Sequence, residues 1–489
     1  MKASPDLHQL IRSMSMSEKR HFKIYSSGHI NGDSKNYLRL FDAIDGQEHY
    51  DEASIKNDFE EETFIRHLPS EKNYLYGNIL ESLNAFNKEK TFLARHSNFL
   101  ISIELLFNKG LFEQSKKLIR KAKAEAYQLE KFSLLLLLLR GELLIYINNE
   151  DDKNLDKCIA EELRILDIMK IQTTLMRIAF NIQIQIDKGR VSDSFLNAQL
   201  KTVKRNYPQQ YDRRTFWVNY YYHSALGLIY TVQNKNLKRY ECFKQIKSIM
   251  DKSPQFIKDL PSIYHSNSNN LVNVMCFLEK YDEAQAIVRR QKEFLNVYGI
   301  KRATLSRIVF LHTSESELYI FYKTKNYAAA SAFVKQIESS VKKIEINFNP
   351  ILFDLIFMMA VSELMVNDFK GTLKWLNQII NAERESIIRK ELQINARILY
   401  VIALFESHDI LFENRLNSAK RFLAQEPQFR MQLKILEAIK YLSEGSSRKK
   451  QKTEFAKTIS EIRKQQKKLN AESLNKQFDF AEWIESKLK

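Results

Sequence analysis

The sequence predicts an all-α protein built as an α-α superhelix, and three observations lead to this fold class. The 489 residues include only 11 Gly and 7 Pro, too few for a sheet protein with many tight turns. Apolar residues recur with helical rather than strand spacing through most of the chain. The helical segments also recur in pairs at intervals of 40 to 46 residues, which is typical of stacked repeats.

Composition limits the class of protein further. With 44% hydrophobic and 28% charged residues, the chain can bury a core, and its formal net charge of +17 favours acidic partners or anionic surfaces. Cys158, Cys242 and Cys276 lie too far apart for a disulfide framework or a zinc motif. The first twenty residues lack the apolar core of a signal peptide, and the apolar stretches 134–139 and 351–366 are too short or too charged to span a bilayer. We therefore expect a cytoplasmic protein.

Residues 1–90 differ from the rest and are expected to form a compact helical domain. The pattern predicts a helix over Leu7–Tyr25, a loop at Ser26–Gly28 and Asn31–Asp33, and short helices over Tyr37–Ile44 and Glu52–Phe59, the latter capped by Asp51. A longer helix is predicted to follow Pro69-Ser70-Glu71, because proline and serine suit a helix start.

This domain has two possible roles. It could close the end of a helical array, or it could be a helix-turn-helix unit with Ser70–Tyr76 on the helix that reads the DNA groove. That helix offers Lys72 and Asn73 but no Arg that could bind guanine in a bidentate manner.

From residue 91 the chain predicts about eight helical hairpins. We mark each by the aromatic residue or leucine that opens its second helix after a polar turn: Phe112, Leu155, Phe195, Leu237, Tyr281, Tyr327, Phe369 and Phe412. Successive marks differ by 43, 40, 42, 44, 46, 42 and 43 residues. At the third mark, Val191-Ser192-Asp193-Ser194 offers an alternative helix start one turn earlier.

A hairpin with one apolar stripe per helix cannot bury it alone, so neighbouring hairpins are expected to stack into a single elongated superhelix. We assign residues 91–445 to this array. Residues 1–90 would cap one end, and basic helices in residues 446–489, with a last helix over Ala471–Leu488, would cap the other.

The openings Tyr281-Asp282-Glu283-Ala284, Asn326-Tyr327-Ala328-Ala329-Ala330 and Asp368-Phe369-Lys370-Gly371 resemble the start of the second helix in tetratricopeptide (TPR) repeats. The resemblance covers residues 91–445. It departs from the family in repeat length, which is 34 residues there, and in lacking the family's Trp-Leu-Gly-Tyr pattern. The resemblance implies protein or peptide binding in a groove lined by first helices, without catalysis. The stretch Ser17–Lys23 is similar to one in uncharacterised bacterial helical-repeat proteins.

A candidate peptide-binding groove follows from the middle of each first helix, fourteen residues before each mark. The first six of these positions are polar or small, and the last two are apolar: Asn98, Gly141, Asn181, His223, Asn267, Thr313, Leu355 and Ile398. Arg177, Asn219, His312 and Glu315 extend this face by about one turn. Asn amides could hold an extended backbone, or these residues could instead bond one another between helices. The aromatic run Trp217–His223 lies in the same region, with some rings in the core and one available to a ligand.

Two basic stretches could contact phosphates without sequence preference, or could simply be solvated helix faces. The first comprises Lys116, Lys117, Arg120, Lys121 and Lys123. The second, Arg448–Lys468, has nine basic and two acidic residues, and its main cations are Arg448, Lys449, Lys450, Arg463, Lys464, Lys467 and Lys468.

The sequence contains no motif that indicates catalysis, a metal site or a bound cofactor. We therefore expect a non-enzymatic scaffold that binds a protein or peptide in the groove of a TPR-like superhelix. The alternative is a nucleic-acid-linked regulator with residues 1–90 as a helix-turn-helix head and the repeats as sensor. A third possibility is a structural part of a larger assembly that uses the sides of the array.

Overall fold

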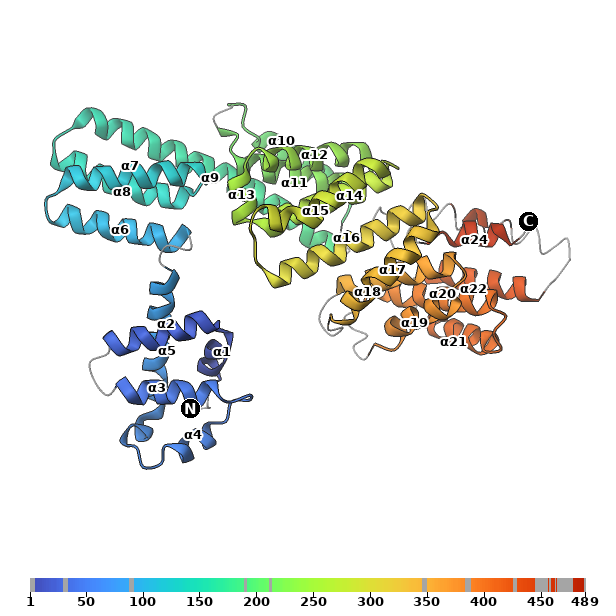
Figure 1. Cartoon of the computed structure of the whole chain (residues 1–489). Helices are drawn as coiled ribbons and strands as arrows, with labels where there is room; N and C mark the ends of the chain where they lie inside the picture. Colours follow the sequence, from blue (N-terminus) through green and yellow to red (C-terminus); the bar gives the residue numbers. More distant parts are fainter. Residues whose placement is uncertain are drawn as a thin grey trace. The chain divides into compact units, whose positions relative to one another are not determined.

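The structure is a computed structural model that describes residues 5–29, 34–87, 92–188, 191–210, 213–344, 350–382, 388–424, 429–444, 456, 459–461, 463 and 478–487. Within these ranges the regular structure is helical and no β-strand occurs, so the predicted all-α class is confirmed (Figure 1). No helix in the described ranges is long and apolar enough to cross a bilayer. The helices divide into two compact units, Met1–Ile165 and Leu166–Lys489.

The first helices of the chain share a small core of their own. They are α1 (Asp6–Ser13), α2 (Met16–His29), α3 (Ser34–Asp45), α4 (Glu52–Asp58), a 3₁₀ turn (Thr63–His67) and α5 (Leu68–Asn87). Their buried side chains include Ile11, Phe22, Phe41, Ile55 and Ile79. Asp51 caps α4 by accepting from the N–H groups of Ala53 and Ser54, as predicted.

Two predictions for this region are wrong. The helix predicted over Leu7–Tyr25 is two helices, because Ser15 and Glu18 form a capping box that starts α2. The Ser15 N–H donates to Glu18 Oε2 at 2.8 Å, and the Glu18 N–H donates to Ser15 Oγ at 3.3 Å. The predicted loop at Ser26–Gly28 belongs to α2, and Asn31–Asp33 lies outside the described residues.

The repeating part of the chain consists of helical hairpins. The helices with residues up to 165 are α6 (Phe92–Asn108), α7 (Phe112–Gln128), α8 (Phe132–Asn148) and the start of α9 (Asp152–Asp187). Those that follow are α10 (Asp193–Asn206), α11 (Phe216–Val232), α12 (Asn236–Asp251), α13 (Pro254–Asp259), α14 (Pro261–Phe277), α15 (Tyr281–Val297), α16 (Ala303–Lys323), α17 (Tyr327–Lys342), α18 (Pro350–Met365), α19 (Phe369–Ile380), α20 (Lys390–Glu406), α21 (Phe412–Ala424), α22 (Arg430–Ser443) and α24 (Phe480–Ser486).

One turn geometry recurs between the two helices of seven hairpins in the described part of the chain. A residue with positive φ ends the first helix, and the next N–H donates to the carbonyl five residues earlier, as in a Schellman motif. The residues with positive φ are Gly110, Glu150, Asn234, Glu279, Lys325, Asn367 and His408. The matching bonds run from Leu111 to Leu106, Asp151 to Tyr146, Lys235 to Tyr230, Lys280 to Met275, Asn326 to Phe321, Asp368 to Glu363 and Asp409 to Leu404.

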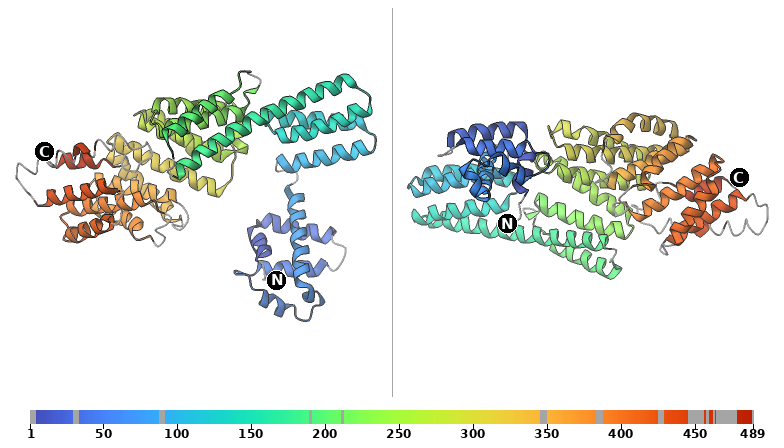
Figure 2. Two further views of the ribbon diagram at one scale, coloured as in Figure 1. Left: turned by 180° about the vertical axis from the view of Figure 1, so that it is seen from behind. Right: turned by 90° about the horizontal axis from the view of Figure 1, so that it is seen from below.

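The predicted hairpin starts agree well with the structure except around α9. Phe112, Tyr281, Tyr327, Phe369 and Phe412 each begin a helix, and Ser192 caps α10 as the sequence alternative allowed. Helix α9, by contrast, continues for 36 residues from the second helix of one hairpin into the first helix of the next (Figure 2). Residues 155–180 contain no Gly, Pro or Asn, so nothing in the sequence interrupts the helix there.

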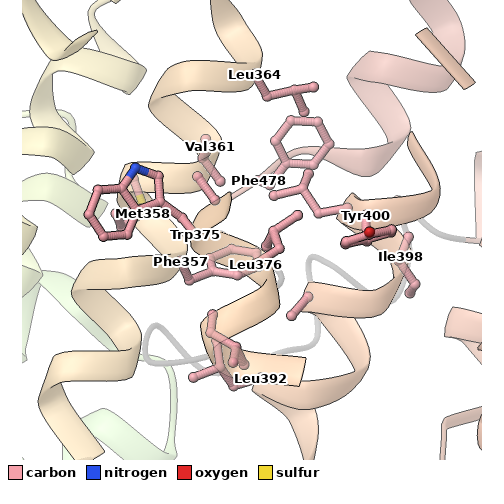
Figure 3. Packing of buried hydrophobic residues seen from close by; sticks show 14 of the residues in the cluster. Phe357, Met358, Val361, Leu364, Trp375, Leu376, Leu392, Ile398, Tyr400 and Phe478 are labelled. Atoms are coloured by element: carbon pink, nitrogen blue, oxygen red, sulfur yellow. The ribbon is translucent and has the colours of Figure 1, made fainter. Parts of the chain in front are cut away.

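The last hairpins enclose the largest core. First helices of successive hairpins contact one another, α14 with α16, α16 with α18, α18 with α20 and α20 with α22. Phe357, Trp375 and Tyr400 all belong to this core, and so does Phe478 from the end of the chain (Figure 3). The last helix is predicted over Ala471–Leu488, but within the described residues it begins only at Phe480, because Asp479 caps α24 by accepting from the N–H group of Glu482. The indole N–H of Trp483 donates to Glu406 at 2.7 Å, which attaches α24 to α20.

Candidate functional site

The second half of α9 presents a regular exposed face. Residues at alternating steps of four and three along the helix all lie at the surface: Leu166, Lys170, Thr173, Arg177, Phe180 and Ile184. Leu166, Phe180 and Ile184 are 44%, 55% and 47% exposed, which is high for large apolar side chains. We call these six residues the α9 face. Its ends are apolar and its centre is polar and cationic.

The opposite side of the same helix segment is buried. Ile168, Leu175, Ile178 and Ile182 are at most 3% exposed. The exposed side of a helix that packs on one side normally carries charged or polar residues. The segment is therefore packed on one side and carries unburied apolar residues on the other, as expected for a surface that binds a partner.

Aromatic side chains of neighbouring helices pack between the α9 face and the core. The ring of Phe180 meets Tyr221 of α11 edge to face at 6.3 Å, and Tyr221 stacks on Trp217 at 5.6 Å. Trp217 in turn contacts Phe216 and Phe256, whose rings stack in the core at 3.9 Å. Phe180 is thus the exposed end of an aromatic cluster that reaches the interior, so its ring needs little additional ordering to bind a partner.

The charge of the α9 face is not neutralised locally. Neither Lys170 nor Arg177 has an ion pair within the described part of the chain. The nearby carboxylate of Asp167 is bound by Arg213, and Thr174 Oγ1 donates to the backbone carbonyl of Lys170. The centre of the face therefore carries positive charge that would attract an acidic group.

Of the predicted groove residues, Arg177 and Asn181 lie on this exposed side of α9. The sequence reasoning missed Phe180, Ile184 and Leu166, which are the apolar part of the site. The spacing 166, 170, 173, 177, 180, 184 was the available signal, since a 3.5-residue repeat predicts a seam that meets another helix.

Asn219, Asn267 and Asn98 are placed differently. The side chain of Asn219 accepts from Tyr207 Oη at 2.6 Å and donates to the carbonyls of Arg214 and Thr215. Asn267 is only 5% exposed and donates to the Ile263 carbonyl at 2.9 Å. Asn98 is half-buried on α6. The amides of Asn219 and Asn267 thus bond nearby backbone carbonyls, and these bonds are not the bonds between groove residues that the sequence offered as the alternative to an open groove.

The two predicted groove histidines are desolvated. The Nδ1 atom of His312 lies 2.9 Å from Nε2 of His265, whose Nδ1 atom lies 2.6 Å from Gln291 Oε1. Burial, reinforced by His265, lowers the pKa of His312 to about 4, and burial alone lowers the pKa of His223 to about 4. Both imidazoles are therefore neutral near pH 7.

The predicted basic surface is described in part. Lys117, Arg120 and Lys121 are exposed on α7, whereas Lys116 lies 3.3 Å from Glu113 and its ammonium is 5.1 Å from the centre of the Tyr146 ring. Lys123 is bound by Glu142 and Glu161. Arg463 pairs with Asp479 and Glu485, at 2.8 and 3.1 Å. The remaining residues lie outside the described ranges: Arg448, Lys449, Lys450, Lys464, Lys467 and Lys468.

Chemistry that needs a metal or a reactive thiol has no visible basis in the described residues. No group of three or more His, Cys, Asp or Glu side chains there could hold a metal ion. Cys158, Cys242 and Cys276 are buried, and desolvation raises the pKa values of their thiols to about 11, 12 and 12. Such thiols are protonated at neutral pH and are poor nucleophiles.

Comparison of the chain with family models, curated proteins and solved structures gives no match. The resemblance to TPR proteins therefore stays a prediction from the repeat openings.

Proposed function

We propose that this chain is a non-enzymatic protein-binding scaffold, built as a TPR-like superhelix, and that the α9 face is where it captures its partner. The observation that carries the proposal is the one-sided packing of this helix segment, which leaves the large apolar side chains of Phe180 and Ile184 about half exposed. Exposed aromatic residues and arginines on a rigid support are the side chains that contribute most to protein–protein binding.

The recurring hairpins support the architectural part of the proposal. The same Schellman turn recurs in seven hairpins, and successive first helices from α14 to α22 contact one another. This is how neighbouring repeats bury a continuous core in helical repeat proteins. Such arrays leave long surfaces for partners, and the α9 face is a surface of that kind.

The test compares two double variants of the full-length chain, each of which replaces two exposed apolar residues by glutamine. Phe180→Gln with Ile184→Gln removes the apolar C-terminal end of the face, while Leu237→Gln with Val297→Gln changes two other exposed apolar residues, 70% and 72% exposed. Each form is tagged, used for capture in its native cell, and the bound proteins are identified and then rebound in purified form.

We expect the α9 pair to weaken binding of the purified partner at least tenfold and the control pair to leave it unchanged. Equal capture by both pairs, with unchanged thermal unfolding, would remove the α9 face as the binding site.

A nucleic-acid-linked function is the second candidate, and it rests on the exposed cations Lys117, Arg120 and Lys121 of α7. Within the head, Lys72 is bound by Glu52 at 2.9 Å and by Tyr50 Oη at 2.6 Å. Its ammonium is thus engaged by the head itself, which weakens the case for α5 as a DNA-reading helix.

A further inference from the structure

We infer that the partner of the α9 face is an amphipathic helix with apolar residues at both ends and acidic residues in its middle. The inference rests on the proposed function and adds the chemistry of the partner. It follows from the spacing, the charge and the length of the face.

The spacing of the residues on the α9 face favours a helical partner. The six residues of the α9 face advance by four, three, four, three and four residues, which is the average 3.5-residue repeat of a left-handed coiled coil, and Asn181 is exposed beside Phe180. Side chains at this spacing interlock with those of another helix that crosses at a shallow angle. An extended strand repeats its side chains every two residues, roughly 7 Å, and would not stay in register with them.

The length is sufficient for such a contact. Eighteen residue steps separate Leu166 from Ile184, and at about 1.5 Å per residue the face is about 27 Å long. A partner helix of about five turns would cover it. Residues 155–180 contain no Gly, Pro or Asn that would interrupt the helix beneath the face.

The positive charge at the centre of the α9 face predicts acidic residues in the middle of the partner helix. Lys170 and Arg177 occupy the centre of the face without an ion pair among the described residues, and apolar residues lie beyond them on both sides. Acidic residues in the middle of the docked helix would pair with these two cations and give the partner its register, as charges do along coiled-coil seams.

The same pattern argues against a second copy of this helix as the occupant. In an antiparallel pair of α9 segments that overlap fully, Leu166 would face Ile184, Thr173 would face Arg177, and Lys170 would face Phe180. The seam would then hold four cations and no anion, and an apolar residue would meet a charge. Both effects oppose association.

Synthetic helices provide the direct test. Two peptides of about 21 residues carry Leu at the seam positions of both ends; one has Glu and the other Lys at the central seam positions. Their binding to the full-length chain is measured by fluorescence anisotropy of a labelled peptide, in four forms of the chain: unchanged, Lys170→Glu with Arg177→Glu, Phe180→Gln with Ile184→Gln, and the control Lys201→Glu with Lys204→Glu. Lys201 and Lys204 are exposed on α10 and have no ion pair within the described ranges.

The unchanged chain and the control should bind the Glu-centred peptide at least tenfold more tightly than the Lys-centred one. The Lys170→Glu, Arg177→Glu form should reverse this preference, and the Phe180→Gln, Ile184→Gln form should bind neither. A preference that does not reverse, or binding that survives loss of Phe180 and Ile184, would overturn the inference.

The outcomes also separate this inference from the proposed function. If a cellular partner requires Phe180 and Ile184 but no helical peptide binds, the scaffold function stands and the helical partner is wrong. If light scattering finds a dimer of the chain that Phe180→Gln with Ile184→Gln dissociates, the occupant is a second copy and the inference fails.

Discussion

Helices α9 and α20 are both rich in apolar residues, yet they are packed very differently. Helix α20 contacts α18, α19, α21 and α22, and it is buried almost continuously from Leu392 to Leu404. The second half of α9 buries Leu175, Ile178 and Ile182 but exposes Phe180 and Ile184. Apolar composition alone therefore does not determine burial in a helical array. Burial depends on how many neighbouring helices surround a segment.

The largest expected difference comes from the same substitution in the two helices. Ile398 of α20 is fully buried, and Ile184 of α9 is 47% exposed. Ile398→Ala should lower the free energy of unfolding by about 2–5 kcal/mol, because it removes buried methyl groups and leaves a cavity. Ile184→Ala should change it by less than about 1 kcal/mol. Urea-induced unfolding followed by circular dichroism measures both, and equal losses would show that the α9 face is buried in solution.

An intermediate effect is expected at His223 of α11, an imidazole that is partly buried. His223 has a pKa of about 4 in the folded chain, against an ordinary value of 6.5, because burial disfavours the imidazolium. The unfolded chain therefore binds this proton more readily, so the stabilising contribution is complete above pH 6.5 and is lost as the pH falls from 6.5 to 4. The difference between the two pKa values corresponds to about 3 kcal/mol.

His223→Phe should remove this part of the pH dependence, since phenylalanine keeps a ring in place and cannot be protonated. Unfolding free energies measured at steps between pH 7 and pH 4 should fall less steeply for the variant than for the unchanged chain. Parallel curves would mean that His223 is solvated in the folded protein.

The smallest effect on stability is expected on α7. Lys117→Gln, Arg120→Gln and Lys121→Gln together should change the free energy of unfolding by less than about 0.5 kcal/mol, because these exposed cations have no ion pair in the described part of the chain. The same triple variant tests the nucleic-acid alternative. If α7 binds phosphates, the plot of the logarithm of the DNA-binding constant against the logarithm of the salt concentration should become less steep. The change in slope should correspond to the loss of up to about three phosphate contacts. Unaltered DNA binding would exclude α7 as the contact surface.

Local sequence determined the secondary structure and much of the repeat. Low Gly and Pro content and helical spacing predicted the all-α class, and the aromatic residues after polar turns predicted where α15, α17, α19 and α21 begin. These features are set within a few residues of chain, by turn conformation and by helix initiation. The capping box at Ser15 and Glu18 is equally local and could have been predicted from its Ser-x-x-Glu spacing.

Only the tertiary structure decided which polar and apolar side chains remain at the surface. Asn181 and Asn267 occupy the same predicted register, yet Asn181 is exposed and Asn267 bonds a backbone carbonyl in the interior. Phe180 is as apolar as Phe357, but Phe180 is half exposed and Phe357 is fully buried. The reason is physical: burial depends on contacts between helices that are distant in the sequence, and no local pattern specifies how many of those helices surround a given residue.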